Sequence, residues 1–213
     1  MFIGVISDTH GVLPEEVKKF LVPVDEVWHA GDFGGGAEFA ERVRLELSGG
    51  DNEAERDAAS GAELPLQRDI AGGAELPARG DAGDSAEQKP APRKHKVFRA
   101  VSGNCDGQDI RRDYPESLFF EVEGLKVLMT HIGGYPGHYD LRAEALIDRY
   151  KPDIFVCGHS HILKVMNDAR RNMLTINPGA CGNQGWHVLR TALRFHINKG
   201  KIHDMEVLNL PRN

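Results

Sequence analysis

The sequence has 213 residues, of which 40% are hydrophobic and 27% are charged, and its formal net charge is -6. This length predicts one domain with a sizeable core, and the acidic balance argues against non-specific nucleic-acid binding, which requires a basic surface. No segment approaches the roughly 20 apolar residues of a membrane span, and the first residues lack the basic leader of a signal peptide. Three cysteines are too few for a disulfide framework. We therefore expect a cytoplasmic protein.

The first region, residues 1–47, alternates between strand and helix signals. Apolar runs at Phe2–Ile6 and Val24–His29 predict buried strands. A helix is expected from Pro14 to about Leu21, because proline followed by two glutamates suits a first helical turn. Apolar residues at helical spacing predict a second helix over Ala37–Leu47.

The second region, about residues 48–96, has a different composition. It is rich in Gly, Ala, Asp and Glu, contains no aromatic residue between 48 and 96, and repeats the pentapeptide GAELP at Gly61–Pro65 and Gly73–Pro77. Such a composition buries too little apolar surface to offset the entropy of ordering. We therefore expect a flexible insertion within a single domain that spans residues 1–213.

Regular structure is expected to resume at Val97–Val101, which reads as a strand. Leu118–Val122 and Lys126–Thr130 flank a Glu-Gly turn and predict a hairpin. Leu141–Tyr150 has a helical pattern, and Ile154–Cys157 has the pattern of a buried strand. Further strands and turns fill the tail. Early alternation and late hairpins together predict an α/β fold with two sheets packed face to face and helices outside.

A recurring pattern points to function, because the predicted strands up to residue 161 are followed by residues of metal-ligand type. The carboxyl ends of strands in an α/β sheet converge on one crevice. The candidate ligands are Asp8, His10, Asp32, Asn104, His131, His159 and His161. Seven ligands are too many for one ion and suit two divalent ions. Mixed nitrogen and oxygen ligation favours Mn²⁺, Fe²⁺, Zn²⁺, Co²⁺ or Ni²⁺ over Ca²⁺, and Mn²⁺ is our first expectation.

Simpler interpretations exist for each piece. Asp8 with His10 also fits a capped turn, and Gly31-Asp32 alone fits an ordinary turn; the repetition after successive strands favours the metal hypothesis. Among the other histidines, His138 and His187 remain undecided. The rest are expected to be structural or solvated, namely His29, His95, His196 and His203.

The motifs DTH, GD, GN, TH and GHSH occur in this order and resemble the calcineurin-like metallophosphoesterase superfamily. VSGNCDG and KPDIFVCGHSHILKV are similar to its small bacterial YfcE-type phosphodiesterases. The resemblance implies two mixed β-sheets flanked by helices. It implies one ion held by Asp8, His10, Asp32 and His161. It implies a second ion held by Asp32, Asn104, His131 and His159. The implied reaction is attack on a phosphate ester by a hydroxide bridging the ions, with Asp32, Asn104 and His131 as catalytic residues.

One position departs from the wider superfamily, where a histidine after the Gly-Asn pair protonates the leaving group. Cys105 occupies that position here, and a thiol is a poor substitute. The adjacent Asp106 would be ionised near neutral pH. We therefore expect a steep dependence of rate on leaving-group pKa, unless another acid such as His138 takes the role.

The leading hypothesis is a phosphodiesterase or phosphomonoesterase acting on a small-molecule phosphate ester, without a membrane or non-specific nucleic-acid partner. The alternative is a protein-interaction scaffold like the retromer subunit Vps29, which the sequence resembles around Tyr114–Glu116. The intact set of ligand positions favours the enzyme. The apolar hairpin Leu118–Met129 could supply the interface of a homo-oligomer.

Overall fold

The computed structural model describes residues 1–49 and 96–212. The predicted insertion at about 48–96 therefore lies almost entirely outside the described residues, and the single interrupted domain stays a prediction. In the described part of the chain, no helix is long and apolar enough to cross a membrane.

The first sheet has five strands in the order β12-β11-β1-β2-β3. Their bounds are Phe2–Ile6 (β1), Glu26–His29 (β2), Val97–Ala100 (β3), Leu189–Asn198 (β11) and Lys201–Pro211 (β12). β1, β2 and β3 run parallel, whereas β11 pairs antiparallel with both β1 and β12. The three parallel strands thus end at the same edge of the sheet, which is where the predicted ligand loops begin.

The second sheet also has five strands, in the order β4-β5-β8-β10-β9. Their bounds are Ser117–Val122 (β4), Leu125–Thr130 (β5), Ile154–Val156 (β8), Leu163–Asp168 (β9) and Met173–Pro178 (β10). β5, β8 and β10 are parallel, and β4 and β9 are antiparallel to their neighbours. A small hairpin follows β5, formed by Gly134–Tyr135 (β6) and His138–Tyr139 (β7).

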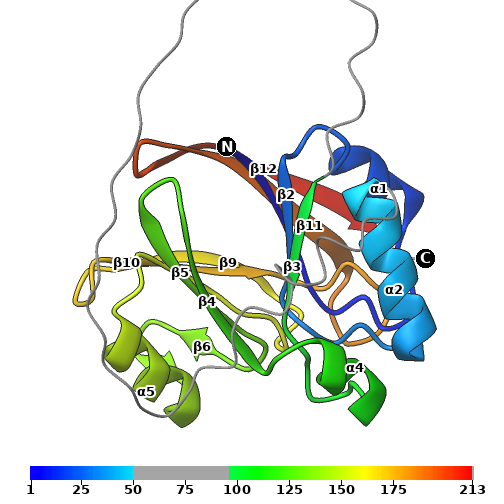
Figure 1. Cartoon of the computed structure of the whole chain (residues 1–213), viewed down its shortest axis with the longest axis horizontal. Helices are drawn as coiled ribbons and strands as arrows, with labels where there is room; N and C mark the ends of the chain where they lie inside the picture. The colour runs from blue at the N-terminus through cyan, green and yellow to red at the C-terminus, as the bar shows by residue number, and fades with distance from the viewer. Residues whose placement is uncertain (50–95, 213) are drawn as a thin grey trace, which may run out of the picture.

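Helices cover the outer faces of the sheets (Figure 1). They are Glu15–Phe20 (α1), Gly36–Ser48 (α2), Gln108–Asp113 (α4) and Leu141–Tyr150 (α5). α1 and α2 pack on the outer face of the first sheet, where Val17 and Val43 join one buried cluster with Val27. α5 packs on the outer face of the second sheet through Ala143 and Ile147. The α/β sandwich expected from the sequence is thus confirmed.

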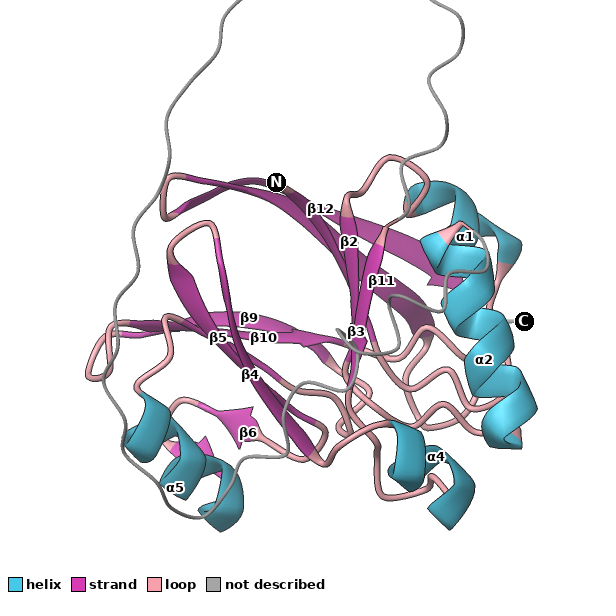
Figure 2. Ribbon diagram, viewed as in Figure 1, coloured by secondary structure: helices cyan, strands magenta, loops and turns pink. Residues whose placement is uncertain are grey.

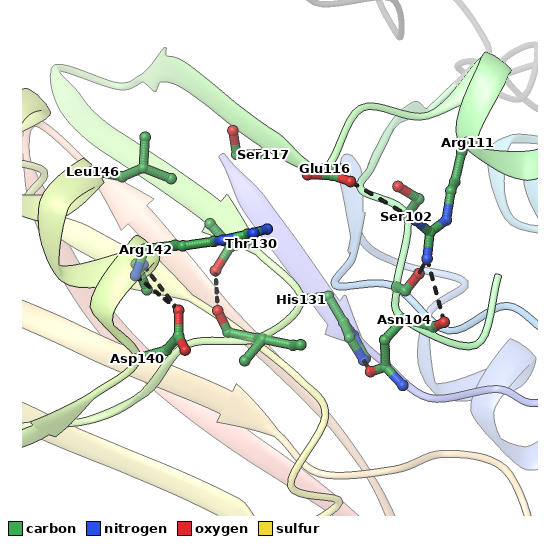
Figure 3. Close-up of a pocket in the computed structure, with 13 residues that line it drawn as sticks. Ser102, Asn104, Arg111, Glu116, Ser117, Thr130, His131, Asp140, Arg142 and Leu146 are labelled. Atoms are coloured by element: carbon green, nitrogen blue, oxygen red, sulfur yellow. Dashed lines mark hydrogen bonds and ion pairs between the residues drawn. The ribbon is translucent and has the colours of Figure 1, made fainter. Parts of the chain in front are cut away.

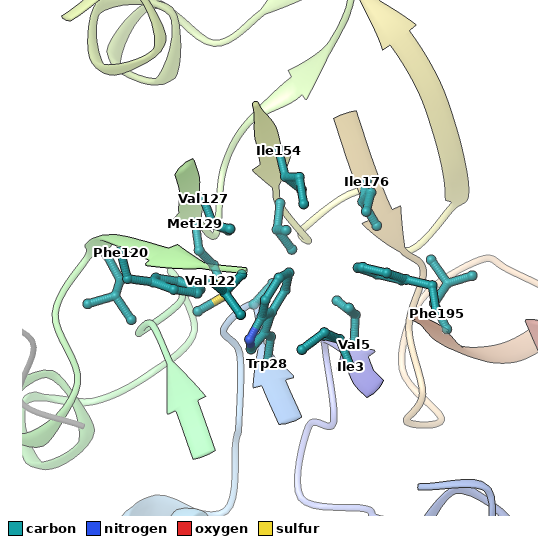
Figure 4. Close-up of a cluster of buried hydrophobic side chains, with 14 of the residues drawn as sticks. Ile3, Val5, Trp28, Phe120, Val122, Val127, Met129, Ile154, Ile176 and Phe195 are labelled. Carbon is teal, nitrogen blue, oxygen red and sulfur yellow. The ribbon is translucent and has the colours of Figure 1, made fainter. Parts of the chain in front are cut away.

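A hydrophobic layer between the sheets holds them together (Figure 4). Trp28 of β2 lies at its centre, fully buried, with edge-on contacts to Phe120 of β4 at 5.3 Å and Phe195 of β11 at 5.9 Å between ring centroids. The apolar side chains Leu118 and Met129 of the β4–β5 hairpin also lie in this layer. They are therefore used inside the chain, and the homo-oligomer stays a prediction.

Candidate metal centre

All seven predicted ligands lie in loops that follow strands, and the structure brings them together. Asp8 and His10 follow β1, Asp32 follows β2, and Asn104 follows β3. The remaining ligands are His131 after β5, and His159 and His161 after β8. Figure 2 shows these loops gathered at one edge of the sandwich. Five strands drawn from both sheets therefore contribute to one site.

One half of the site is built around Asp8, which is fully buried. Its Oδ1 atom lies 3.2 Å from His161 Nε2 and 3.9 Å from His10 Nε2. The two imidazole Nε2 atoms are 3.2 Å apart. Asp8 Oδ2 accepts a hydrogen bond of 3.2 Å from the backbone N–H of His159. Asp8 therefore links the loop after β1 to the loop after β8.

The other half is built around His131, of which 3% is exposed. Its Nε2 atom lies 3.2 Å from Asp32 Oδ2 and 3.0 Å from Asn104 Oδ1. Its Nδ1 atom donates to the carbonyl oxygen of Ala30 at 2.8 Å, which fixes the tautomer and turns Nε2 toward the site. The His131 and His159 rings meet edge to face, 5.3 Å apart between centroids.

Asp32 lies between the two halves. Its Oδ2 atom is 3.2 Å from His131 Nε2 and 3.8 Å from His10 Nε2, and 2% of the residue is exposed. Its Oδ1 atom accepts the backbone N–H of Cys105 at 2.8 Å. This central position matches the bridging role that the sequence resemblance implies for Asp32.

The ligand loops hold strained backbone. Left-handed φ angles are costly for residues with a Cβ atom and gather at functional sites. Five of the seven candidates have them: Asp8 (56°), His10 (45°), Asp32 (58°), His159 (67°) and His161 (58°). Because the surrounding hydrogen bonds maintain this strain, the side chains are directed inward before any ligand binds.

Contacts within the site shift the pKa values of three of the candidate ligands. Burial opposes ionisation of Asp32, but its contacts with His131 and the Cys105 N–H lower its pKa below the usual range. Burial also lowers the pKa of His10, which therefore offers a neutral ring. The Asp8 carboxylate beside it raises the pKa of His161. A divalent ion would replace the protons shared between these imidazoles and carboxylates.

The donor set fits a metal ion. Asp8 Oδ1 is buried and has no hydrogen-bond partner of good geometry among the described residues, although three imidazole Nε2 atoms lie within 4.0 Å of it. An unpaired buried carboxylate oxygen is costly, and coordination to a cation would remove that cost. Two carboxylates, four imidazoles and one amide oxygen are the ligands that transition metals bind in proteins.

The candidate ligands differ in solvent exposure from one side of the site to the other. Asp8, Asp32 and His131 are buried, whereas Asn104 and His159 are exposed. A pocket of about 630 Å³ opens over this side, lined also by Cys105, Trp186 and His187. A substrate would therefore approach from the exposed side.

Two residues support the ligand loops by hydrogen bonds that the sequence did not predict. The Asp106 carboxylate accepts backbone N–H groups from Asp32 at 3.0 Å, Gly34 at 3.1 Å and Gly103 at 2.7 Å, and so joins two ligand loops. Asn177 donates to the carbonyl of Gly158 at 2.6 Å and supports the loop that carries His159 and His161. Asp106 stands directly after the Gly-Asn-Cys motif, which is a signal in the sequence, whereas Asn177 lies in an Asn-Pro-Gly segment that reads first as a turn.

The undecided histidines now have positions. His187 packs edge to face on His161, 5.4 Å apart between ring centroids, in the pocket over the site. His138 and His159 line a neighbouring pocket. His29 is fully buried and stacks on Phe33 at 3.9 Å, in agreement with a structural role.

Two histidines of the tail, His196 and His203, are expected from the sequence to be solvated. His203 is exposed, but His196 is half-buried and stacks on Phe2 at 4.0 Å. His95 lies outside the described residues. Neither His196 nor His203 lies with the seven candidate ligands, so among the described histidines the candidate centre keeps the four that the motifs predicted.

Solved structures share this fold. Vps29 from Entamoeba histolytica in complex with Zn²⁺ aligns with a TM-score of 0.58 at 14% identity, covering 100% of both chains. A predicted phosphoesterase from Streptococcus pneumoniae aligns with a TM-score of 0.50 at 20% identity, covering 99% of this chain and 89% of that one. Chaetomium thermophilum Vps29 aligns with a TM-score of 0.59 at 11% identity, covering 100% of both chains. These low identities establish the fold alone.

Sequence comparison establishes the family. No relative among the curated proteins matches the chain. The model of the calcineurin-like phosphoesterase superfamily domain matches residues 78–200, which is more than half of the chain. This match includes the Asn104, His131 and GHSH motifs, and the residues before it supply the remaining ligands to the same site. The chain therefore belongs to the calcineurin-like phosphoesterase superfamily.

Proposed function

We propose that this protein is a metal-dependent phosphodiesterase that acts on a small-molecule phosphate ester. It would use two divalent ions, for which Mn²⁺ is the first candidate. The observation that carries the proposal is the gathering of seven nitrogen and oxygen ligands at one edge of the sandwich, where Asp32 approaches imidazoles of both halves of the site. The family supports phosphoester hydrolysis and metal dependence in general. The diester preference, the number of ions and their identity are the proposed refinements.

The ligand sets follow from the two halves. Asp8, His10, Asp32 and His161 would hold one ion. The second ion would be held by Asp32, Asn104, His131 and His159. Two bound ions supply a nucleophilic hydroxide at neutral pH and stabilise charge on the phosphoryl oxygens.

The chain's own residues prepare this chemistry. Ala30 orients His131, and the Cys105 N–H helps to keep Asp32 ionised. Asn104 offers a neutral oxygen, so two dications would leave the site with a net positive charge toward an anionic ester. Exposed Asn104 and His159 lie where the ester would enter. Asp32, Asn104 and His131 are accordingly the residues proposed to take part in catalysis.

The alternative function is a Vps29-like scaffold, which the shared fold favours. Metal binding does not separate the two functions, because the Entamoeba Vps29 structure itself contains Zn²⁺. Hydrolysis does separate them. A scaffold would bind protein partners without metal-dependent turnover of a phosphodiester.

The deciding experiment measures hydrolysis of bis(p-nitrophenyl) phosphate with and without Mn²⁺. We expect turnover that requires the metal and falls by at least about a hundredfold in Asp32→Ala. Asp113→Ala is the matched control, because Asp113 is a surface carboxylate whose ion pair within the described structure is with its neighbour Arg112 at 3.4 Å. Absence of metal-dependent turnover, or full activity of a folded Asp32→Ala, would overturn the proposal.

A further inference from the structure

A second pocket, of about 410 Å³, adjoins the candidate metal centre (Figure 3). Asn104 and His131 form its inner end, so a group bound there would lie beside the attacked phosphate. α5 forms the opposite wall with Arg142 and Leu146. The pocket therefore begins at two proposed metal ligands and extends away from them.

Arg142 brings an unpaired charge to this pocket. Its side chain extends from the first turn of α5 across Thr130 (Figure 3). Among the described residues its guanidinium has no hydrogen bond or ion pair, since neighbouring Asp140 instead caps the backbone N–H groups of Arg142 and Ala143. Arg149, on the same helix, lies over the Tyr150 ring at 5.3 Å. Arg142 is thus free to bind an anion.

Arg111 brings a second charge from the opposite side of the pocket. Its guanidinium donates to the carbonyl oxygens of Asp106 at 2.9 Å, Gly103 at 3.2 Å and Asn104 at 3.3 Å. These bonds fix its position relative to the ligand loop. Its Nη1 atom is 3.8 Å from exposed Glu116, which balances part of its charge. Of the two arginines that line the pocket, Arg142 therefore has more N–H donors available to bind an anion.

The pocket wall also contains an unpaired hydroxyl. Ser102 is 4% exposed, lines the pocket, and its Oγ atom has no hydrogen-bond partner in the described structure. A buried hydroxyl without a partner is costly. An oxygen-rich group bound in the pocket would offer it a partner. This observation is independent of the arginines and indicates the same kind of ligand.

From these features we infer that the pocket binds a second phosphate of the substrate through the Arg142 guanidinium. The preferred substrates are then phosphodiesters that carry a further phosphate beside the one attacked. Guanidinium groups bind phosphate with two parallel hydrogen bonds, which gives both affinity and orientation. The inference rests on the proposed phosphodiesterase function and adds the substrate class to it. Arg142 acts here as a specificity residue.

The test compares two substrates that differ in one phosphate: thymidine 5′-(p-nitrophenyl phosphate) and the same compound with a 3′-phosphate. With Mn²⁺ present, we expect the 3′-phosphate to lower KM about tenfold for the wild-type protein. Arg142→Ala should abolish this preference and leave turnover of the simpler substrate unchanged. Arg149→Ala, on the same helix, should retain the preference.

The outcomes separate the two claims. Hydrolysis of both substrates with equal KM, or a preference that survives in Arg142→Ala, would overturn the inference and leave the phosphodiesterase intact. Failure to hydrolyse either substrate would overturn the proposed function, and the inference with it. Arg142 is exposed, and its side chain forms no hydrogen bond with any residue that the structure describes. Replacing it with alanine is therefore not expected to unfold the protein.

Discussion

Cys105 occupies the position where a leaving-group acid is expected. Burial, and then its contact with Asp32, raises the pKa of this thiol to about 11, so it keeps its proton near neutral pH and is a weak acid. We predict that rates for aryl methyl phosphates with Mn²⁺ fall steeply as the leaving-group pKa rises. A flat dependence would contradict this and would indicate another acid. His138, in the pocket that it shares with His159, would be the first residue to replace.

His29 should make stability depend on pH. Gly31 N–H donates to its Nδ1 atom, so Nε2 carries the proton toward Thr9 Oγ1 at 3.1 Å. Complete burial lowers the pKa of His29 from 6.5 to about 3. The unfolded chain therefore binds more protons at this residue than the folded chain does. The contribution of neutral His29 to the free energy of unfolding is complete above pH 6.5 and is lost progressively as the pH falls toward 3.

The corresponding variant is His29→Phe, which keeps the ring stacked on Phe33 and removes the titrating group. It should be less stable than wild type near neutral pH, because two hydrogen bonds are lost. The deficit should shrink by about 1.4 kcal/mol on going to about pH 5.5. Urea unfolding of both proteins at several pH values measures this. A deficit that stays constant with pH would contradict the prediction.

At the residue scale, the sequence predicted the ligands better than their supports. The seven candidates share one sequence pattern, in which a carboxylate, amide or imidazole side chain follows shortly after an apolar strand. The structure brings all seven together. The sequence indicated only that Asp106 would be ionised, and not that it accepts backbone N–H groups, because two of its three donors, Asp32 and Gly34, lie more than 70 positions away. Such long-range hydrogen bonds leave no local pattern.

At the scale of elements, Asp106 joins the loop after β2 to the loop after β3. We predict that Asp106→Asn lowers the free energy of unfolding by about 2 kcal/mol, because an amide cannot accept hydrogen bonds at both of its ends. Metal affinity should fall as well, since Asp32 N–H is one of the three donors.

The matched control is Asp109→Asn, because the exposed Asp109 accepts a single backbone N–H from outside its own helix, that of Ala37 at 2.8 Å. It should change stability and metal affinity much less. Denaturant unfolding and metal titration measure both quantities. If Asp106→Asn matched wild type in both, the two loops would not depend on this carboxylate.

The elements that sequence patterns predicted are long or strongly apolar. Phe2–Ile6, Leu141–Tyr150 and the hairpin around Glu123-Gly124 are present as expected. The short helix α4 and the two-residue strands β6 and β7 were not predicted. They are too short for a hydrophobic period, and their formation depends on contacts with the ligand loops and α5.

At the scale of the whole molecule, the two described parts of the chain, residues 1–49 and 96–212, lie next to each other where the undescribed segment begins and ends. Lys96 N–H donates to the carbonyl oxygen of Ser48 at 3.0 Å, so a short linker can span this point. We predict that replacing residues 50–95 with a short Gly-Ser linker preserves the fold and metal-dependent hydrolysis. The shorter loop should favour folding by roughly 2 kcal/mol. Loss of cooperative unfolding or of activity would contradict a single interrupted domain.

The packing of two sheets around Trp28 places five strand ends at one edge, and we propose that this edge binds two metal ions. Equilibrium dialysis against excess Mn²⁺, followed by elemental analysis, tests it most directly. We predict two ions per chain for wild type and for Asp113→Ala, and fewer for Asp32→Ala. One ion per chain, or none, in the wild-type protein would show that the edge does not bind a pair of metal ions.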